Sequence, residues 1–576
     1  MIKKLLSCVG EYKKYAILTP VIMIGEVLME VTIPLVMAQI LDVGIATGNT
    51  SYTVKMGMLM ICMALFSLLC GALGGKFAAQ AGMGFAKNVR KRLFDKVQDF
   101  SFANVDRFST ASLVTRLTTD VTNVQNTFMM IIRMAVRSPF MLIFALIMAV
   151  RINSRLALVF LAAIPVLAIS MSLIVGKAFP LFEKMLEKYD KLNSIVQENL
   201  IGIRVVKAFV REKFEGEKFV ASADDVRTAQ LKAEKIVIMN MPVMQLIVYF
   251  CIVAVLYFGG GMVIDGTFQI GQLSSFITYV NQILMSLMML SMIFVMTTIS
   301  MASMHRIVEI FDEVPDIADE DNSVELTPED GSIVFDKVSF SYSKDAEAPA
   351  LKDVSLKIKS GETIGIIGGT GSSKTTLVQL IPRFYDVTEG SITVGGHDVR
   401  EYKLDNLRNE VAMVLQKNVL FSGTIKDNLR WGDENATDEQ IENACKQAQA
   451  HDFIMSFPDG YDTDLGQGGV NVSGGQKQRL CIARALLKKP KIVILDDSTS
   501  AVDTATDAKI REAFSKELAD TTTIIIAQRI SSVQDADRII VLSDGQVDAF
   551  DTHENLLKNN EIYREVYTSQ QKGAEE

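Results

Sequence analysis

The chain has 576 residues, of which 49% are hydrophobic, and its formal net charge is −9. This length allows two or more domains, and the net acidity argues against nucleic acid as a partner. The six cysteines are scattered without a CxxC pair and the four histidines show no ligand spacing, so neither a disulfide framework nor a metal site built from these residues is expected. The first residues do not combine a short apolar region with a cleavage site, so no removable signal peptide is expected.

Six apolar stretches in the first 300 residues predict transmembrane helices, because each has about 20 residues, the length that crosses a bilayer. They lie near residues 15–41, 55–80, 130–150, 156–176, 236–260 and 272–298. Residues 1–14 before them are basic and amphipathic, which suits a helix on the cytoplasmic membrane surface. The sequence therefore predicts a multi-pass protein of the plasma membrane.

Basic residues set the predicted orientation of these spans. The segments after the second and fourth spans are rich in Lys and Arg, whereas the loops 42–54 and 261–270 contain neither. The positive-inside rule then places both termini in the cytoplasm, with Arg151 and Arg155 as a mild exception. The two long cytoplasmic connections have helical periodicity, so they are expected to form stalks that turn near residues 106–112 and 203–212.

Charged and sulfur-containing side chains occur inside the predicted spans. Glu26 and Glu30 lie four residues apart on one face of the first span, where charges are costly and usually functional. Two interpretations stay open: a wall that attracts cations, or carboxylates that line a wet cavity or pair with another helix. Arg133 and Arg137 are expected to reach the interface or to pair structurally. Methionines of the sixth span suit either apolar ligands or helix packing; they are Met285, Met288, Met289, Met292, Met296, Met301 and Met304.

Residues 313–330 are acidic and contain two prolines, which predicts a linker. It separates a transmembrane domain, residues 1–312, from a domain of residues 331–576 that alternates strand-like and helix-like patterns. The predicted fold class is therefore multi-domain: an all-α transmembrane domain of six helices with long cytoplasmic extensions, followed by an α/β P-loop nucleotide-binding domain.

A glycine-rich stretch between a predicted strand, 363–367, and a predicted helix, 376–381, fits a phosphate-binding loop. Lys374 would reach the β- and γ-phosphates of ATP, and the Thr375 hydroxyl would bind Mg²⁺. The usual pattern has a glycine before the lysine, where this chain has Ser373, and a Cβ is costly there if φ is positive. A glycine-rich turn without nucleotide is the simpler alternative. The predicted ATP-contacting residues are Gly368, Gly369, Thr370, Gly371, Ser372, Ser373, Lys374, Thr375 and Thr376.

Two predicted strands in this domain end in residues that could contact a nucleotide or bind Mg²⁺. A predicted strand over residues 338–342 ends at Tyr342, whose ring could stack on adenine or belong to the edge of the core. A buried strand that begins at Lys491 ends in Asp496 and Asp497, and carboxylates at such a position suit Mg²⁺ coordination.

A Ser-Gly-Gly turn before a predicted helix over 477–487 is a second candidate phosphate cradle. A plain helix N-cap is the alternative. Two phosphate cradles far apart in one chain suggest that two chains form a sandwich. The residues of this turn are Ser473, Gly474, Gly475 and Gln476.

In type and order, these motifs resemble those of half-transporters of the ATP-binding cassette (ABC) exporter family with the type IV fold, over essentially the whole chain. The resemblance implies that Tyr342 is the aromatic A-loop residue, that Gln416 is the Q-loop glutamine and a Mg²⁺ ligand, and that Asp496 is the Walker B aspartate. It also implies a D-loop at residues 500–503 and a signature motif at 472–476. The implied activity is ATP-driven export by alternating access, with ATP and Mg²⁺ as cofactors.

Two further positions depart from the family pattern. Asp497 stands where the family has a glutamate that polarises the attacking water, and a carboxylate one methylene shorter is poorly placed. Gln528 stands where the family has a histidine, and an amide cannot become a cation. The resemblance to asymmetric exporters therefore implies a heterodimer. This chain would form the slow, degenerate ATP site, and its signature motif would complete the competent site of a second, homologous half-transporter.

The expected substrate is a small, amphipathic or apolar compound. The alternative is a regulatory or homodimeric ABC subunit that exports a peptide or a lipid. A soluble ATPase is excluded if the six spans insert into the membrane.

Overall fold

The computed structural model describes residues 1–575 apart from 320–324, 344–347, 498–503 and 518–519. The chain divides into two compact units. The first, helical unit comprises Met1–Gln98 and Ala111–Glu313, and the second comprises Asp99–Thr110 and Val314–Glu576. The short segment Asp99–Thr110 thus belongs to the second, α/β unit, although residues Ala111–Glu313 of the helical unit lie between it and the rest of that unit in the sequence.

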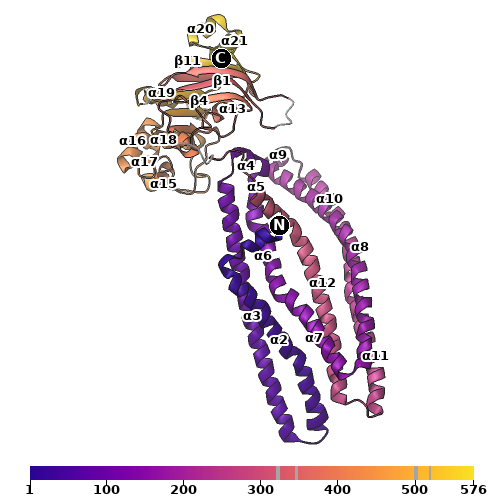
Figure 1. Ribbon diagram of the computed structural model, residues 1–576. Coiled ribbons are helices and arrows are strands. Elements are labelled where there is room, and N and C mark those ends of the chain that lie inside the picture. The colour runs from indigo at the N-terminus through magenta and orange to yellow at the C-terminus, as the bar shows by residue number, and fades with distance from the viewer. Residues whose placement is uncertain (320–324, 344–347, 498–503, 518–519, 576) are drawn as a thin grey trace. The chain divides into compact units, whose positions relative to one another are not determined.

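Long helices make up the first unit (Figure 1). Among the residues that the structure describes, six helical segments are long and apolar enough to cross a membrane, which confirms the predicted number of spans; they are Gly10–Ile45, Thr50–Gln98, Thr110–Ile152, Ser154–Ile201, Glu212–Ile264 and Ile270–Asp312. The α-helices are α1 (Ile2–Ser7), α2 (Lys13–Gln39), α3 (Thr50–Gln98), α5 (Thr110–Thr115), α6 (Val121–Met130), α7 (Val136–Ile152), α8 (Ser154–Ile201), α9 (Ile203–Ala208), α10 (Glu212–Ile238), α11 (Asn240–Ile264) and α12 (Ile270–Asp312). Shorter turns of other helix types are η1 (Gly10–Tyr12), η2 (Ile40–Ile45), η3 (Arg116–Asp120) and η4 (Ile131–Ala135).

The helices α8 and α10 pack side by side, with the short helix α9 joining them (Figure 1). Helix α9 lies where the sequence predicts the second cytoplasmic turn. The apolar part of the span that contains α8 continues into a charged part, which explains why the helix is far longer than a bilayer requires.

An ion pair with a buried carboxylate connects the third and sixth membrane segments at their polar ends. The carboxylate of Asp120, in η3, is buried and accepts hydrogen bonds from Ser303 Oγ at 2.8 Å and Arg306 Nε at 2.7 Å, both in α12. Arg116, one turn earlier, donates to the carbonyl oxygen of Arg306 and to the Glu309 carboxylate, both at 2.7 Å. Because Asp120 is buried, removing its partners would leave a costly unpaired charge.

The described part of the second unit contains two larger β-sheets. The antiparallel sheet has the order β2-β1-β4-β5, and the mixed sheet has the order β12-β11-β3-β10-β9-β6, in which only β12 runs antiparallel. Strands β7 (Gly423–Thr424) and β8 (Asp464–Leu465), which are distant in sequence, pair as a small antiparallel sheet. The other strands are β1 (Ile333–Phe340), β2 (Leu351–Ile358), β3 (Thr363–Gly368), β4 (Glu389–Val394), β5 (His397–Asp398), β6 (Val411–Val414), β9 (Ile492–Asp496), β10 (Thr522–Ile526), β11 (Arg538–Ser543) and β12 (Gln546–Asp551).

Helices cover the mixed sheet, and its inner strands β9 and β10 are buried along their whole length, which explains their apolar runs, residues 492–495 and 524–526. The helices of this unit are α4 (Phe102–Phe108), α13 (Lys374–Gln379), α14 (Leu404–Glu410), α15 (Ile425–Leu429), α16 (Asp438–Gln447), α17 (His451–Met455), η5 (Gly460–Asp462), α18 (Gly474–Leu487), α19 (Thr504–Glu517), η6 (Ile530–Ser532), α20 (His553–Asn559) and α21 (Glu561–Glu575). The observed elements confirm the predicted fold class.

Candidate nucleotide site

The carboxyl ends of three adjacent parallel strands bring the predicted phosphate-binding residues to one edge of the mixed sheet. Strand β10 lies between β3 and β9. Strand β3 ends at Gly368, β9 ends at Asp496, and β10 is followed two residues later by Gln528. In open α/β sheets, ligands bind at this edge.

The Lys374 ammonium group lies against the loop between β3 and α13. Its Nζ donates hydrogen bonds to the carbonyl oxygens of Gly368 at 2.9 Å and Gly369 at 2.8 Å. Burial lowers the pKa of Lys374, and the nearby carboxylates of Asp496 and Asp497 oppose that shift. An anion that entered the loop could replace the two carbonyl groups as the partner of this ammonium.

Ser373 has the left-handed backbone conformation in which a Cβ causes strain. Its φ is 69° and its ψ is 28°, immediately before α13 begins. Gly371, two residues earlier, also has a positive φ, of 85°. A residue with a Cβ pays about 1–2 kcal/mol in this region, whereas glycine does not.

The Thr375 hydroxyl and the Asp496 carboxylate form the oxygen pair that could hold Mg²⁺. Thr375 Oγ1 donates to Asp496 Oδ1 at 3.1 Å, and Asp496 is buried. Burial raises the pKa of Asp496, and the hydrogen bond from Thr375 lowers it in part. Hydroxyl and carboxylate oxygens are ligands that Mg²⁺ prefers, so these residues fit the ion. Bound there, Mg²⁺ would neutralise charge on the phosphates.

Two of the three positions that depart from the family pattern, Asp497 and Gln528, contact each other. Gln528 Nε2 donates to Asp497 Oδ2 at 2.8 Å, and the side chain of Gln416 also hydrogen-bonds the Asp497 carboxylate. Burial raises the pKa of Asp497, and these two hydrogen bonds lower it in part. Asp497 has a positive φ of 50°, a conformation that aspartate tolerates better than most residues. Gln416, which the sequence predicts as a Mg²⁺ ligand, thus lies beside Asp497 and the sheet edge.

Tyr342 follows strand β1, which ends at Phe340, so the strand predicted over 338–342 is two residues too long. The Tyr342 hydroxyl hydrogen-bonds Thr376 Oγ1 at 3.0 Å, which connects the predicted adenine platform to the phosphate-loop helix. Burial raises the pKa of Tyr342. The ring of Tyr385 packs edge-on against it at a centroid distance of 5.2 Å, and the Tyr385 hydroxyl donates to Asp106 Oδ2 at 2.7 Å.

Sequence reasoning did not identify Tyr385. It lies far from Tyr342 and Asp106 in sequence, and no spacing rule connects the three residues. The only local signal is that it is an aromatic residue in the turn after the phosphate-loop helix.

The Ser-Gly-Gly turn caps helix α18 in the way that the simpler alternative predicts. Ser473 Oγ accepts from the N–H of Gln476 at 3.3 Å, and Gln476 Oε1 accepts from the N–H of Ser473 at 2.8 Å, a capping box. Gly474 and Gly475 begin the helix, so the N–H groups of its first turn remain oriented toward the helix N-terminus, where a phosphate can bind. The predicted D-loop, residues 500–503, lies outside the described residues.

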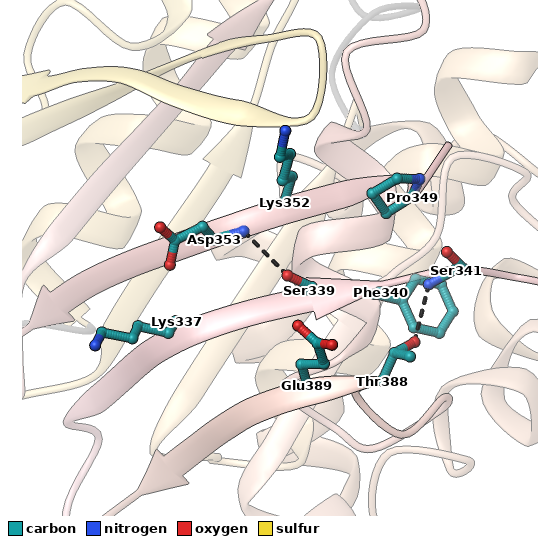
Figure 2. Close-up of a pocket in the computed structure, with 9 residues that line it drawn as sticks. All are labelled: Lys337, Ser339, Phe340, Ser341, Pro349, Lys352, Asp353, Thr388 and Glu389. Carbon is teal, nitrogen blue, oxygen red and sulfur yellow. Dashed lines mark hydrogen bonds between the residues drawn. The ribbon is translucent and has the colours of Figure 1, made fainter. Parts of the chain in front are cut away.

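A shallow hollow of about 520 Å³ lies over the antiparallel sheet (Figure 2). Two backbone-to-side-chain hydrogen bonds cross it, from the N–H of Asp353 to Ser339 Oγ at 3.2 Å and from the N–H of Ser341 to Thr388 Oγ1 at 3.1 Å. Its lining comes from β1, β2, β4 and the residues beside them, so it is separate from the phosphate loop.

In the helical unit, the structure favours the pairing interpretation for one of the two intramembrane glutamates. Arg137 Nη2 lies 2.6 Å from Glu30 Oε2, whereas its Nε lies 3.8 Å from Glu26 Oε1. Among the described residues, none hydrogen-bonds the buried Oε2 of Glu26. Glu30 is thus paired with another helix, and Glu26 keeps unused acceptor capacity.

Comparisons with known proteins agree with this architecture. The model of the ABC transporter transmembrane region matches residues 17–287, and the ABC transporter model matches residues 351–500. The chain is 38% identical to an uncharacterized ABC transporter ATP-binding protein, YfiB, of Bacillus subtilis, over 99% of this chain and 98% of that protein. It is 35% identical to an ATP-dependent lipid A-core flippase of Desulfotalea psychrophila over 85% of each chain.

Two further similarities extend over almost the whole chain. A putative multidrug export ATP-binding/permease protein, YgaD, of Bacillus subtilis is 32% identical over 99% of each chain. The structure of a bacterial Atm1-family ABC exporter with ATP bound matches with a TM-score of 0.83 and 25% identity, over 97% of this chain and 98% of that chain. The chain therefore belongs to the ABC transporters, as an exporter half-transporter whose ATPase domain powers export through a dimer with another ABC half.

Proposed function

We propose that this chain is the degenerate-site subunit of a heterodimeric ABC exporter. Its Walker side, with Lys374, Thr375 and Asp496, binds ATP and Mg²⁺ and retains the nucleotide. Its signature motif completes the site in which a partner subunit supplies the catalytic glutamate and histidine. Both termini face the cytoplasm, and the chain divides into a transmembrane domain of residues 1–312, a linker of residues 313–330 and a nucleotide-binding domain of residues 331–576.

The hydrogen bond between Gln528 and Asp497 carries this proposal. A general base must present a free oxygen to the attacking water within hydrogen-bond reach. Asp497 has a shorter side chain than glutamate, and it accepts amide hydrogen bonds from Gln528 and from Gln416. The shorter side chain places the carboxylate farther from the attacking water, and the two hydrogen bonds occupy its acceptor oxygens. Glutamine at position 528 can hydrogen-bond a γ-phosphate, but it cannot supply a positive charge.

The signature turn supports the second part of the proposal. Its capping box leaves the helix α18 well formed, with two glycines at the first positions. Glycines let another chain's phosphate approach the backbone closely, and the helix N-terminus favours negative charge. This arrangement can complete an ATP site that another subunit begins.

The first test compares the ATPase activity of the chain purified alone with that of the chain co-purified with a candidate partner half-transporter. Little activity alone and strong activity in the pair are expected. Introducing Asp497→Glu together with Gln528→His should raise the activity of the chain alone, because these changes restore the two catalytic groups. Normal exporter activity of the unaltered chain alone would contradict the proposal.

For the substrate, we propose a small amphipathic or apolar compound, which agrees with the methionines of α12 and with the similarity to a putative multidrug export protein. A lipid is the second candidate, because the chain is also 35% identical to a lipid A-core flippase. The two candidates differ in a direct assay. Inside-out vesicles that accumulate a fluorescent lipophilic cation on addition of ATP support the first, and proteoliposomes that translocate a fluorescent phospholipid instead support the second.

A further inference from the structure

A side-chain amide of the C-terminal helix α21 holds the backbone on both sides of Arg529. Gln570 Nε2 donates to the carbonyl oxygen of Gln528 at 2.8 Å, and Gln570 Oε1 accepts from the N–H of Ile530 at 2.8 Å. Arg529 is extended, with φ −102° and ψ 130°, so these two backbone groups point to the same side, as along the edge of a β-strand. Gln570 thus satisfies them as a neighbouring strand would.

The packing of helix α21 fixes the position of the Gln570 side chain. Tyr563, near the start of the helix, is fully buried, and its hydroxyl hydrogen-bonds His553 Nδ1 at 2.7 Å. Val566 and Tyr567 pack against the core beneath the mixed sheet. Gln570 lies one turn after Val566, so the packed face of the helix fixes the position from which it reaches the loop.

The backbone that Gln570 holds carries a side chain of the candidate nucleotide site. Gln528 Nε2 donates to Asp497 Oδ2 at 2.8 Å, and the N–H of Asp497 donates to the carbonyl oxygen of Ile526 at 3.1 Å. A continuous set of hydrogen bonds therefore connects α21, through Gln528, with the carboxylate at the end of β9. A shift of the loop by a fraction of an ångström would change the contact between Gln528 and Asp497.

We propose that Gln570 is a positioning residue for the ATP site of this chain. It fixes the backbone of Gln528, so that the Gln528 amide meets Asp497 and, when ATP is bound, the γ-phosphate. The C-terminal helix thereby sets how long the Walker side of this chain retains ATP. This inference rests on the proposed function for the assignment of Gln528 to the ATP site.

The test uses the full-length chain in the assembled transporter, loaded with radiolabelled azido-ATP, chased with unlabelled ATP and photolabelled at intervals. Labelling of this chain, resolved from its partner by size, reports the half-time of retention. Gln570→Ala should shorten this half-time about tenfold, the change expected when two neutral hydrogen bonds that order the loop are lost. Gln570→Glu keeps the acceptor for Ile530 but loses the donor to Gln528, so it should also shorten retention.

Gln571→Ala is the matched control, because Gln571 lies on the same helix and its side-chain amide donates to the Tyr567 hydroxyl, one turn earlier, at 2.6 Å. It should leave the half-time unchanged. Gln528→Ala should also shorten retention, and adding Gln570→Ala to it should have no further effect, because Gln570 acts through Gln528. Equal half-times for Gln570→Ala and Gln571→Ala, or additive effects of Gln570→Ala and Gln528→Ala, would overturn the proposal.

A second measurement separates this inference from the heterodimer proposal. If the unaltered chain alone hydrolyses ATP rapidly, the heterodimer proposal fails. The coupling of Gln570 and Gln528 can then still be measured, from the separate effects of their substitutions on the kcat and on the KM of ATP hydrolysis. Hydrogen exchange of the Ile530 amide, about tenfold faster in Gln570→Ala at an unchanged melting temperature, supports the positioning role in either case. An unchanged exchange rate contradicts it.

Discussion

Ser373 combines a side chain with a backbone conformation that favours glycine. Its φ of 69° lies in the left-handed region, where a residue with a Cβ is strained. We expect Ser373→Gly to stabilise the protein by about 0.5–1 kcal/mol, which is the relief of left-handed strain less the entropy cost of glycine. Thermal unfolding in detergent measures this gain, and the ATP affinity should change less than twofold.

The neighbouring residue provides the control for this substitution. Ser372 is not among the residues with positive φ, so Ser372→Gly should lower stability by roughly the same amount. A gain in ATP affinity of more than fivefold in Ser373→Gly would mean that the loop changes conformation when nucleotide binds, contrary to this account.

Asp120 is expected to stabilise the helical unit. Its carboxylate is 1% exposed and accepts hydrogen bonds from Ser303 and Arg306 of α12. Hydrogen bonds to charged groups contribute about 1.5–3 kcal/mol, and the partly exposed Arg306 can turn to water when its partner is lost. We therefore expect Asp120→Ala to cost about 2 kcal/mol of unfolding free energy, measured in detergent.

An exposed ion pair of the same unit tests whether burial causes this effect. Lys188 lies 3.2 Å from Asp225, with about half of each side chain exposed. Such pairs contribute about 0–1 kcal/mol, so Lys188→Ala should change the melting temperature little. Similar losses for Asp120→Ala and Lys188→Ala would show that the buried ion pair does not stabilise the bundle.

At the scale of elements, the short helix α4 is held to the nucleotide-binding unit by aromatic contacts. Phe102 of α4 stacks on Phe384 at a centroid distance of 4.3 Å, and Asp106 accepts a hydrogen bond from Tyr385, whose ring packs against Tyr342. We expect Tyr385→Phe to weaken the docking of α4 while ATP affinity changes less than twofold, because the ring beside Tyr342 remains. Tyr385→Ala should lower ATP affinity several-fold, because it removes that ring.

Hydrogen exchange in α4 and ATP binding measure the two effects separately. Tyr402→Phe is the control, because it also removes a buried hydroxyl, which donates to the Val394 carbonyl at 2.6 Å. It should leave exchange in α4 unaltered. If Tyr385→Phe and Tyr385→Ala lowered ATP affinity equally, the hydroxyl rather than the ring would support Tyr342.

The sequence predicts the six spans, the α/β fold and the phosphate loop because each depends on local information: apolar length, periodicity and a glycine pattern. It does not predict that Asp99–Thr110 belongs to the α/β unit, or that Gln570 reaches Gln528, because these contacts join distant parts of the chain. Strand β1 is two residues shorter than predicted at its carboxyl end, since apolar alternation continues past the last pairing. The sequence shows only that Ser373 would be strained if its φ were positive, because the residue type does not determine the backbone angle. The structure gives Ser373 a positive φ.

At the scale of the whole transporter, the proposed function gives the chain two different half-sites. The Walker side lies at the carboxyl edge of the mixed sheet, with Thr375 and Asp496, and the signature motif lies at the N-terminus of α18. In a head-to-tail dimer, these half-sites face different nucleotides. Disabling each of them in this chain should therefore have unequal effects on ATP hydrolysis, and the inequality reports which site hydrolyses ATP.

We expect Gly475→Asp to lower the ATPase activity of the assembled transporter about 100-fold, because it places a carboxylate where the N-terminus of α18 would stabilise the partner's γ-phosphate. Lys374→Ala should lower the activity much less, because it affects only the site that we propose to be slow. Azido-ATP labelling of this chain should persist in Gly475→Asp, which shows that its own Walker side is folded, and should be lost in Lys374→Ala. Equal losses of activity in both variants would mean that the two sites are equivalent, and the chain would then have to be treated as a symmetric half-transporter.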